Sequence, residues 1–293
     1  MGQNYRFVNK DGVLNVDRVG MRRAIWSDAY HALINLKWRY FITWLVVIYL
    51  GINLIFASLY WVEGYYIGGE KGWSFVECFF FSVQTLSTIG YGAMAPQSTY
   101  ANALVTLEAF IGMLVTAMST GLLFSKFSRP TARVEFSNVA VVHEFNGQRT
   151  LMFRLANMRG NQIVDAQIDV SFARFETSSE GAEFRRFYDL EMTRKRTAMF
   201  VLTWTAMHIL DECSPLYGLS KQDWYDSQAE IVVLISGVDG TFGQTVHARY
   251  SYTIDEICYD ARFKDMLHVR EDDGVLEVNY HNFNEIEERG SCV

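Results

Sequence analysis

The chain has 293 residues, of which half are hydrophobic, and a formal net charge of −7. This length allows about two domains, and the negative charge argues against nucleic acid as a partner. The four cysteines show neither C-x-x-C spacing nor a cluster with histidine, so we expect reduced thiols rather than disulfides or a metal site. The first 39 residues are polar and charged with no apolar core, so we expect no cleavable signal peptide.

The first predicted element is an amphipathic helix from Val19 to Trp38. Ile25, Trp26 and Leu33 fall near one face of this helix and the charged residues fall elsewhere. Such a helix can lie in the plane of a membrane interface. The alternative is a surface helix of a soluble domain.

Two apolar stretches follow, from Tyr40 to Trp61 and from Ala101 to Phe127. The first holds no charged residue and, as a helix, spans roughly 30 Å, the thickness of a bilayer core. The second contains Glu108 as its only charge before Lys126. A charge-free run of this length is rare in soluble cores, so we predict membrane spans rather than buried helices of a soluble domain.

Lysine and arginine flank the two spans, while only Lys71 lies between them. Loops rich in these residues stay in the cytoplasm, so both termini are expected there. Between the spans, Trp73 to Ser87 is apolar but too short to cross a bilayer, which favours a re-entrant helix. Ser74 and Glu77 are spaced as a capping box at its start.

The pentapeptide Thr88-Ile89-Gly90-Tyr91-Gly92 follows the short helix directly. It matches the known pattern of a K⁺ selectivity filter, in which rings of backbone carbonyls replace the hydration shell of the ion. Gly90 and Gly92 give the backbone the freedom to turn those oxygens inward, Thr88 adds a hydroxyl, and Tyr91 packs away from the ion. One chain supplies one strand of a ring. We therefore predict a homotetramer that binds K⁺ and needs no organic cofactor.

From Arg133 onwards the sequence changes to short runs of alternating polarity. This pattern predicts an antiparallel β-sandwich. The tail after Asp265 is polar and supports no prediction. The predicted strands are Arg133–Phe136, Asn138–His143, Leu151–Leu155, Ile163–Arg174, Phe200–Trp204, Ile231–Ile235 and Val246–Tyr252, and the turns between them include Asn146-Gly147, Arg159-Gly160, Glu180-Gly181 and Asp239-Gly240.

With these parts in order, the chain resembles the inward-rectifier potassium channels, and most closely their bacterial KirBac branch. The resemblance runs from about Asn15 to Asp265. Its motifs are Phe80-Phe81-Ser82-Val83-Gln84-Thr85, the filter, Thr106-Leu107-Glu108, Ser119-Thr120-Gly121-Leu122, Phe127-Ser128-Arg129-Pro130-Thr131-Ala132, Leu151-Met152-Phe153-Arg154-Leu155-Ala156-Asn157, the nine residues from His208 to Leu216, and His247-Ala248-Arg249-Tyr250.

The resemblance implies a two-helix tetrameric pore domain, with slide, outer, pore and inner helices, and an all-β immunoglobulin-like cytoplasmic domain. We expect a cytoplasmic N-terminus with the slide helix at 1–38, the pore domain at 39–130 and the β-sandwich with its tail at 131–293. The protein would be a voltage-independent channel and not an enzyme, in the inner membrane of a bacterium.

The resemblance also implies roles for single residues. Gly121 matches a hinge of the inner helix, Phe124 a hydrophobic constriction below it, and Gly243 the loop Asp239–Gln244 that forms a second constriction. Regulation by anionic lipid is implied, with about 1 kcal/mol of attraction for each basic group near the surface, although ordinary positive-inside asymmetry explains the same residues. The candidates for lipid contact are Arg22, Arg23, Lys126 and Arg129.

Two positions depart from the pattern of the eukaryotic members. Thr116 stands where they commonly carry an acid that holds Mg²⁺ or polyamines in the pore, so only weak rectification by such blockers is expected. Gln84 and Ala93-Met94 stand where they carry an ion pair that steadies the filter. Glu108 is the candidate replacement, since an acid within a membrane span should face the protein interior.

Two other functions are less well supported. A different two-span potassium channel, whose C-terminal domain binds a nucleotide or Ca²⁺, would usually have an α/β domain with a Gly-rich phosphate loop after a strand, and the sequence has no such loop. A membrane-anchored enzyme would need a cluster of catalytic groups, whereas the six histidines are scattered.

Overall fold

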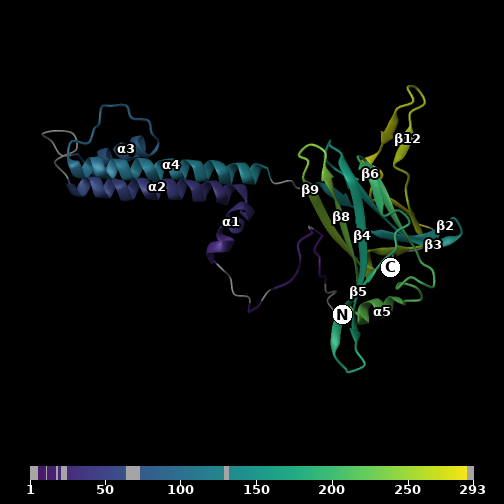
Figure 1. Cartoon of the computed structure of the whole chain (residues 1–293). Helices are drawn as coiled ribbons and strands as arrows, with labels where there is room; N and C mark the ends of the chain where they lie inside the picture. The colour runs from purple at the N-terminus through teal and green to yellow at the C-terminus, as the bar shows by residue number, and fades with distance from the viewer. Residues whose placement is uncertain are drawn as a thin grey trace. The chain divides into compact units, whose positions relative to one another are not determined.

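The structure is a computed structural model that describes residues 6–10, 12–17, 19–20, 25–63, 73–128 and 132–288. The chain forms two compact units (Figure 1). The helical unit is Gly20–Arg129, and the β-rich unit combines Met1–Val19 with Pro130–Val293. The N-terminal segment before the first helix therefore belongs to the β-rich unit, although it precedes the helices in sequence.

The described residues of the helical unit form four helices, and the two long ones confirm the predicted spans. Both begin two residues earlier than predicted and are long and apolar enough to cross a membrane. The predicted helix 19–38 is described only from Ile25, and the chain leaves helical geometry at Leu36 and Lys37. The helices are α1 (Ile25–Asn35), α2 (Trp38–Glu63), α3 (Phe75–Leu86) and α4 (Thr99–Phe127).

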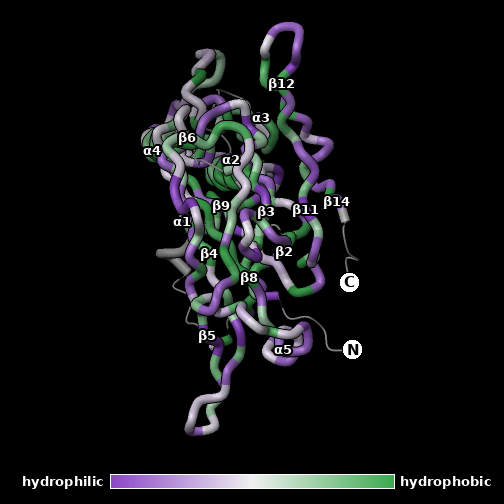
Figure 2. The backbone as a smooth tube through the Cα atoms, turned by 90° about the vertical axis from the view of Figure 1, so that its right-hand side faces the viewer, coloured by the Kyte–Doolittle hydropathy of each residue, from purple (hydrophilic) through white to green (hydrophobic). Residues whose placement is uncertain are grey.

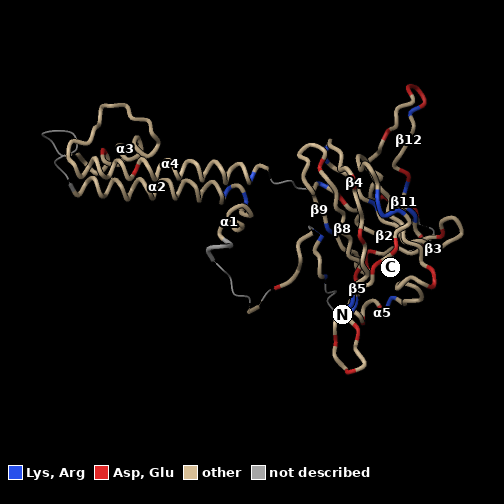
Figure 3. The backbone as a smooth tube through the Cα atoms, in the orientation of Figure 1, with Lys and Arg blue, Asp and Glu red and all other residues tan. Residues whose placement is uncertain are grey.

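The capping box predicted for the short helix is present at the start of α3. The Ser74 side chain accepts from the Glu77 N–H, and the Glu77 carboxylate accepts from the Ser74 N–H at 2.7 Å. Figure 3 shows almost no charge along α2 and α4, with basic residues near the end that adjoins α1. Only 17% of the most apolar window of α2 and 11% of that of α4 are buried within the chain. Such helices need lipid or further protein chains to cover them.

The β-rich unit is built from two five-stranded sheets, as the alternating sequence predicts (Figure 1). One sheet has the order β1-β3-β2-β10 with β7 also paired to β3, and the other has the order β5-β4-β8-β9 with β6 also paired to β4. Their strands are β1 (Val134–Phe136), β2 (Ala140–Phe145), β3 (Gln148–Asn157), β4 (Ile163–Thr177), β5 (Glu183–Asp189), β6 (Arg196–Phe200), β7 (Thr203–Ile209), β8 (Glu230–Asp239), β9 (Thr245–Thr253) and β10 (Ile257–Tyr259).

One continuous hydrophobic core lies between these sheets. Phe153 of β3 is fully buried, as is Ile168 of β4, and Trp224 of the short helix α5 (Lys221–Asp226) packs against Phe172. The hydrophobic positions along β4, β8 and β9 stand out in Figure 2. Burial of this interior is the main force that holds the unit together.

Three details of the sandwich differ from the prediction. A strand over 200–204 is wrong, because β6 ends at Phe200 and β7 begins at Thr203, with the exposed Val201 and Leu202 between them. The pairing is antiparallel except between β2 and β10, which are parallel. Strand β5 has no predicted counterpart, because its mostly exposed arginines and acids break the alternating pattern.

The tail after Asp265 is fixed to the sandwich. Met266 and Phe283 pack with Ala156, and the buried Arg154 donates to the carbonyls of Lys264 at 2.7 Å and Asn282 at 3.2 Å. The sequence carried no prediction here, because a tail this polar lacks the alternating pattern of a strand. Its elements, with the strand before it, are β11 (Ala261–Phe263), β12 (Leu267–Val269), β13 (Leu276–Val278), a 3₁₀ turn at Tyr280–Asn282 and β14 (Ile286–Glu288).

The N-terminal segment is held by the second sheet. The N–H of Phe7 donates to both carboxylate oxygens of Glu230, at 3.1 and 3.0 Å, and Glu230 also pairs with Arg185 at 2.8 Å. The Ser251 hydroxyl donates to the carbonyl of Val8, whose side chain is buried. The buried Glu230 carboxylate with these two donors, and the bond from Ser251 to Val8, tie the start of the chain to β8 and β9.

Candidate ion-conduction site

The predicted filter, residues 88–92, begins where α3 ends. The N–H groups of Thr88 and Ile89 donate to the carbonyls of Thr85 and Gln84, at 3.1 and 2.8 Å, and so continue the last turn of the helix. All five filter residues are exposed in the single chain, including Tyr91 at 76%. The short helix is thus followed directly by an uncovered backbone.

The filter backbone alternates in handedness. Thr88, Gly90 and Gly92 have positive φ angles of 56°, 56° and 82°, whereas Ile89 and Tyr91 do not. Glycine adopts this conformation without steric cost, while Thr88 is strained there. A backbone that alternates between the two hands turns successive carbonyls toward the same side, as a ladder of oxygen ligands requires.

Gln84 and Met94 flank the filter at the positions where the sequence lacks the expected ion pair. The amide Nε2 of Gln84 lies 3.9 Å from the Met94 sulfur, a weak acceptor. This contact joins the pore helix to the chain after the filter, but a neutral amide on a thioether is weaker than a charged pair. Firmer support must come from elsewhere.

The candidate for that support is a buried polar network centred on Glu108. Its two carboxylate oxygens contact the Ser82 hydroxyl at 2.5 Å and the Tyr60 hydroxyl at 2.6 Å. Ser82 also lies 3.0 Å from Oδ1 of Asn53, whose amide donates to the carbonyl of Tyr49 at 2.7 Å. Glu108, Ser82 and Asn53 are buried, so the network joins α4, α3 and α2 in the interior of the unit. Glu108 therefore faces the protein, as predicted for an acid within a span.

Sequence reasoning missed three further contacts behind the filter. The Tyr49 hydroxyl lies 2.7 Å from that of Ser87, the residue before the filter. A Cβ on Gly112 would come within 2.4 Å of the Leu86 carbonyl, so only glycine lets α4 approach the end of α3 this closely. Tyr60 completes the Glu108 network. The signal in the sequence that could have found this network is Asn53, the strongly polar residue of an otherwise apolar span.

The residues predicted for the conduction path below the filter lie on α4. Thr116 and Phe124 lie eight residues apart, and Thr120, for which no role was predicted, lies midway between them on the same slowly turning stripe of the helix. All three are exposed in the single chain, Phe124 at 71%. A Cβ on Gly121 would meet no atom within 4 Å, so this glycine is not required by packing within the chain.

The loop with Gly243 is shaped by Asp239 at the end of β8. One carboxylate oxygen of Asp239 accepts from the N–H of Thr241 at 2.8 Å and of Phe242 at 3.2 Å, and the other accepts from Asn161 at 2.8 Å. Burial alone would raise the pKa of Asp239, but these donors and the nearby Arg159 outweigh it, and the pKa is lowered. Gly243 has a φ of 65° and an open surround, so the loop has a defined path with its tip exposed.

The structure describes only Lys126 among the four residues predicted to contact lipid. Arg22, Arg23 and Arg129 lie outside the described residues. The Lys126 ammonium donates to the carbonyls of Ile34 and Leu36 at 2.9 and 2.5 Å and lies 5.2 Å from the Trp38 ring centre. Lys126 is thus engaged with the end of α1.

Comparison with known proteins agrees with this architecture along the whole chain. Residues 8–130 match the model of the inward rectifier potassium channel transmembrane domain, and residues 134–292 match that of the inward rectifier potassium channel C-terminal domain. The inward rectifier potassium channel Kirbac3.1 of Paramagnetospirillum magnetotacticum is 43% identical over 282 residues, which cover 96% of this chain and 95% of that protein. The chain belongs to the inward rectifier potassium channel family.

Animal relatives are more distant and longer. The G protein-activated inward rectifier potassium channel 1 of Gallus gallus is 32% identical, covering 97% of this chain and 62% of that protein. The mouse G protein-activated inward rectifier potassium channel 3 is 31% identical, covering 96% and 77%. The channel is therefore a potassium channel rather than an enzyme, with two membrane-spanning helices and a β-rich C-terminal domain.

Proposed function

We propose that four copies of this channel surround one pore, and that residues 88–92 of each copy supply the carbonyl rings that select K⁺. The observation that carries the proposal is the alternating handedness of an exposed backbone held at the end of α3. A single exposed strand of carbonyls coordinates an ion from one side only, so a ring requires neighbours. The uncovered apolar surface of α2 and α4 provides area for them and for lipid.

The same arrangement gives two places to close the pore. Four Phe124 side chains that meet on the axis form a hydrophobic constriction that stops ions by excluding water. Gly121, three residues earlier, allows α4 to bend because nothing packs against it. The loop that contains Gly243 forms the second constriction.

Rectification should be weak in this channel. Thr116 offers a hydroxyl instead of a carboxylate on the stripe that leads to Phe124. Mg²⁺ and polyamines, which would block the pore by binding to acids there, are therefore held loosely.

The surrounding membrane would modulate the pore. Arg22 and Arg23 precede the first span, and Lys126 and Arg129 lie at the end of the second, so all four would be near the cytoplasmic interface and would attract anionic lipid. The same distribution of lysine and arginine would place both termini in the cytoplasm, with a bacterial inner membrane as the location.

The test is ion flux into liposomes that contain the purified channel. We expect uptake of Rb⁺ driven by a K⁺ gradient, block by Ba²⁺, and no uptake of Na⁺. Cross-linking of the purified protein should give a band of four chains. Equal fluxes of Na⁺ and K⁺ would contradict the assignment of the filter, and a stable monomer or dimer that conducts would contradict the ring.

A further inference from the structure

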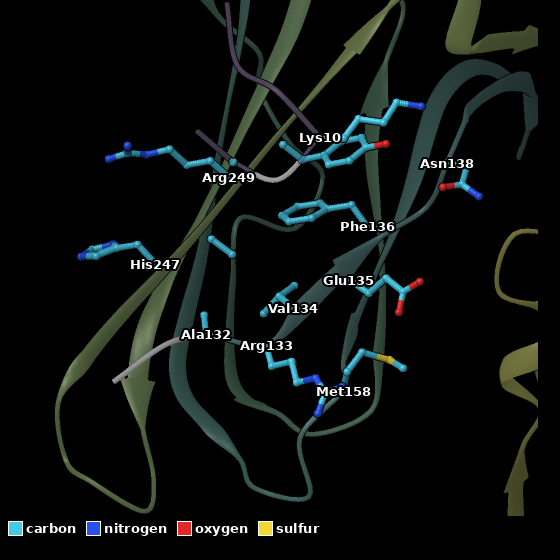
Figure 4. A pocket seen from close by; sticks show the side chains of 13 residues that line it. Lys10, Ala132, Arg133, Val134, Glu135, Phe136, Asn138, Met158, His247 and Arg249 are labelled. Atoms are coloured by element: carbon cyan, nitrogen blue, oxygen red, sulfur yellow. The ribbon is translucent and has the colours of Figure 1, made fainter. Parts of the chain in front are cut away.

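Two cavities of the β-rich unit are lined in part by lysine or arginine, and they differ in how their side chains are arranged. The larger, of about 650 Å³, is lined by Lys10, Arg133 and Arg249, which point in different directions (Figure 4). These three groups are not placed to hold one ligand together. The smaller, of about 420 Å³, has Arg149 as the only charged residue among those that line it. This volume is within the range of small-molecule sites.

The smaller cavity lies between one sheet and the segment that covers it. The sheet is the one that contains β3, and the covering segment is residues 210–224, which ends in α5. From this segment Leu210, Leu216, Leu219 and Trp224 line the cavity. Trp224 is only 3% exposed, whereas the cavity opens to solvent beside the exposed Arg149. An apolar interior with one cation at its edge is the result.

The strand register places this cation and the apolar groups on the same face of the sheet. Residues directly opposite each other in a ladder share a face, as do residues two apart along a strand. Leu151 of β3 lies opposite Val142 of β2, which in turn lies opposite Tyr259 of β10. Val142 and Leu151 belong to the hydrophobic core between the sheets. Arg149, two residues before Leu151, therefore stands on the core-facing side of β3, where a hydrophobic residue is usual.

The Arg149 guanidinium is directed to a wall of the cavity and has no anionic partner. It lies 5.7 Å from the centre of the Tyr259 ring, and both residues line the cavity. Glu144 faces Arg149 across the β2–β3 ladder, yet Arg149 forms no ion pair with Glu144 or with any other residue that the structure describes. A guanidinium binds a carboxylate through two parallel hydrogen bonds. An arginine left free beside an apolar cavity is therefore suited to an acid that carries an apolar chain.

We propose that this cavity binds a soluble monocarboxylate with a single apolar chain of medium length, such as octanoate. The carboxylate accepts hydrogen bonds from the Arg149 guanidinium at the edge of the cavity. The chain lies against Val142 and Leu151 on one side and against Leu210 and Leu216 on the other, all of which line the cavity. One chain of this length suits the volume better than the two long chains of a phospholipid. The site is separate from every residue assigned to conduction.

The experiment measures binding of octanoate to the full-length channel in phosphatidylcholine nanodiscs by isothermal titration calorimetry, with the heat from empty nanodiscs subtracted. We expect saturable binding of one molecule per chain. Hexanoate should bind about tenfold more weakly, because two fewer methylene groups are buried. Octanamide, which keeps the chain but has no charge, should bind at least about tenfold more weakly than octanoate. These three ligands test the proposal on the wild-type protein alone.

Arg149→Gln tests the residue that binds the carboxylate. This variant should weaken octanoate binding by at least about tenfold and leave octanamide binding unchanged, because only the acid loses charge-assisted hydrogen bonds. Glu144→Gln should bind octanoate as tightly as wild type or more tightly, because it removes a negative charge opposite Arg149. An unchanged melting temperature shows that each variant is folded.

The matched control is Arg186→Gln on β5. Arg186 is also an exposed arginine over a tyrosine ring, 4.9 Å from the centre of Tyr188, but it lies outside the cavity, and its loss should leave the affinity for octanoate unchanged. Absence of saturable binding, or the same heat from empty nanodiscs, would overturn the proposal. Equal affinity for octanoate and octanamide, or in wild type and Arg149→Gln, would overturn the role of the cation. Equal affinity for hexanoate and octanoate would overturn the apolar part of the site. Because calorimetry does not depend on ion flux, failure here is distinguishable from failure of the proposed pore.

Discussion

The two units of this channel differ in what one chain can complete. The β-rich unit closes its own core, with Phe153, Ile168 and Tyr252 at 0% exposure. The helical unit buries a polar network behind the filter but leaves the filter itself and Phe124 uncovered. The β-rich unit is thus stabilised by contacts within one chain, whereas the function of the helical unit depends on neighbouring chains. Substitutions should therefore separate conduction from stability according to the unit in which they fall.

The largest expected effect is the loss of K⁺ flux in Gly90→Ala. Gly90 has a φ of 56°, where an added Cβ is strained although nothing else lies within 4 Å. Relief of that strain rotates the carbonyls away from the axis, and we expect flux to fall at least about a hundredfold, because selective entry needs all carbonyl rings. Rb⁺ uptake by liposomes measures the loss, and size-exclusion chromatography should show an unchanged assembly.

Gly51→Ala is the matched control for that substitution. Gly51 lies within α2, also with open space around it, and alanine favours a helix over glycine. Flux should be kept in this variant. If Gly90→Ala conducts K⁺ normally, the filter is not at residues 88–92. The helical unit would then not carry conduction in the way that separates it from the β-rich unit.

In the β-rich unit, Phe153→Ala should produce the opposite result. The Phe153 ring is fully buried and lies 5.5 Å from that of Tyr252, so its removal should lower the free energy of unfolding by about 3–5 kcal/mol. Urea unfolding in detergent measures the change. Those channels that still fold should discriminate K⁺ from Na⁺ as wild type does. Phe145→Ala on the neighbouring strand β2, where the ring is 41% exposed, should change stability by much less.

Ser82→Ala should have a smaller effect, which is a loss of thermal stability that depends on K⁺ in the filter. It leaves one oxygen of Glu108 and the Oδ1 of Asn53 without their shared hydroxyl, which costs about 1–3 kcal/mol for buried groups. We expect a lower melting temperature of the purified channel, and a larger drop in low K⁺, where ions no longer help to order the filter. Ser58→Ala removes an exposed hydroxyl bonded to a carbonyl of its own helix and should be nearly silent. An equal drop in both variants would show that the network does not support the filter.

Much of this organisation could be predicted because local patterns determine it. The spans follow from charge-free length, the start of α3 from the Ser74–Glu77 pair, and the β-sandwich from alternation and turn dipeptides such as Asn146-Gly147, whose φ angles of 51° and 75° suit a tight hairpin. Contacts between segments far apart in sequence could not be predicted in this way. Tyr60 looks like an interfacial aromatic at the end of the first span and Tyr49 lies in its middle, yet their hydroxyls bond to Glu108 and Ser87. The N-terminal segment gives no local sign that Glu230 holds it, because that contact depends on how β8 is placed.

The smallest expected effect is a pH dependence of the β-rich unit through His208. The ring is 4% exposed, with Nδ1 2.7 Å from the carbonyl of Glu191 and Nε2 2.8 Å from the hydroxyl of Ser214. Burial lowers the pKa of His208 below its ordinary value of 6.5, although the Glu191 carbonyl and the charge of Asp211 act in the opposite direction. Below that ordinary value the unfolded chain binds a proton that the folded ring does not, so the free energy of unfolding falls as the pH falls.

The measurement that isolates this contribution is the difference in unfolding free energy between wild type and His208→Gln, taken at about pH 7.5 and about pH 5.5. Gln keeps a donor and an acceptor but does not titrate, so the carboxylates that titrate in both proteins cancel in the difference. The advantage of wild type over the variant should shrink on acidification, because only the wild-type ring resists taking up the proton in the folded state. K⁺ flux per folded channel should not change, because His208 lies in the unit that completes its own core. K⁺ flux per folded channel that falls in His208→Gln together with stability would contradict this expectation. It would show that the β-rich unit influences the pore, and that only substitutions in the filter separate conduction from stability.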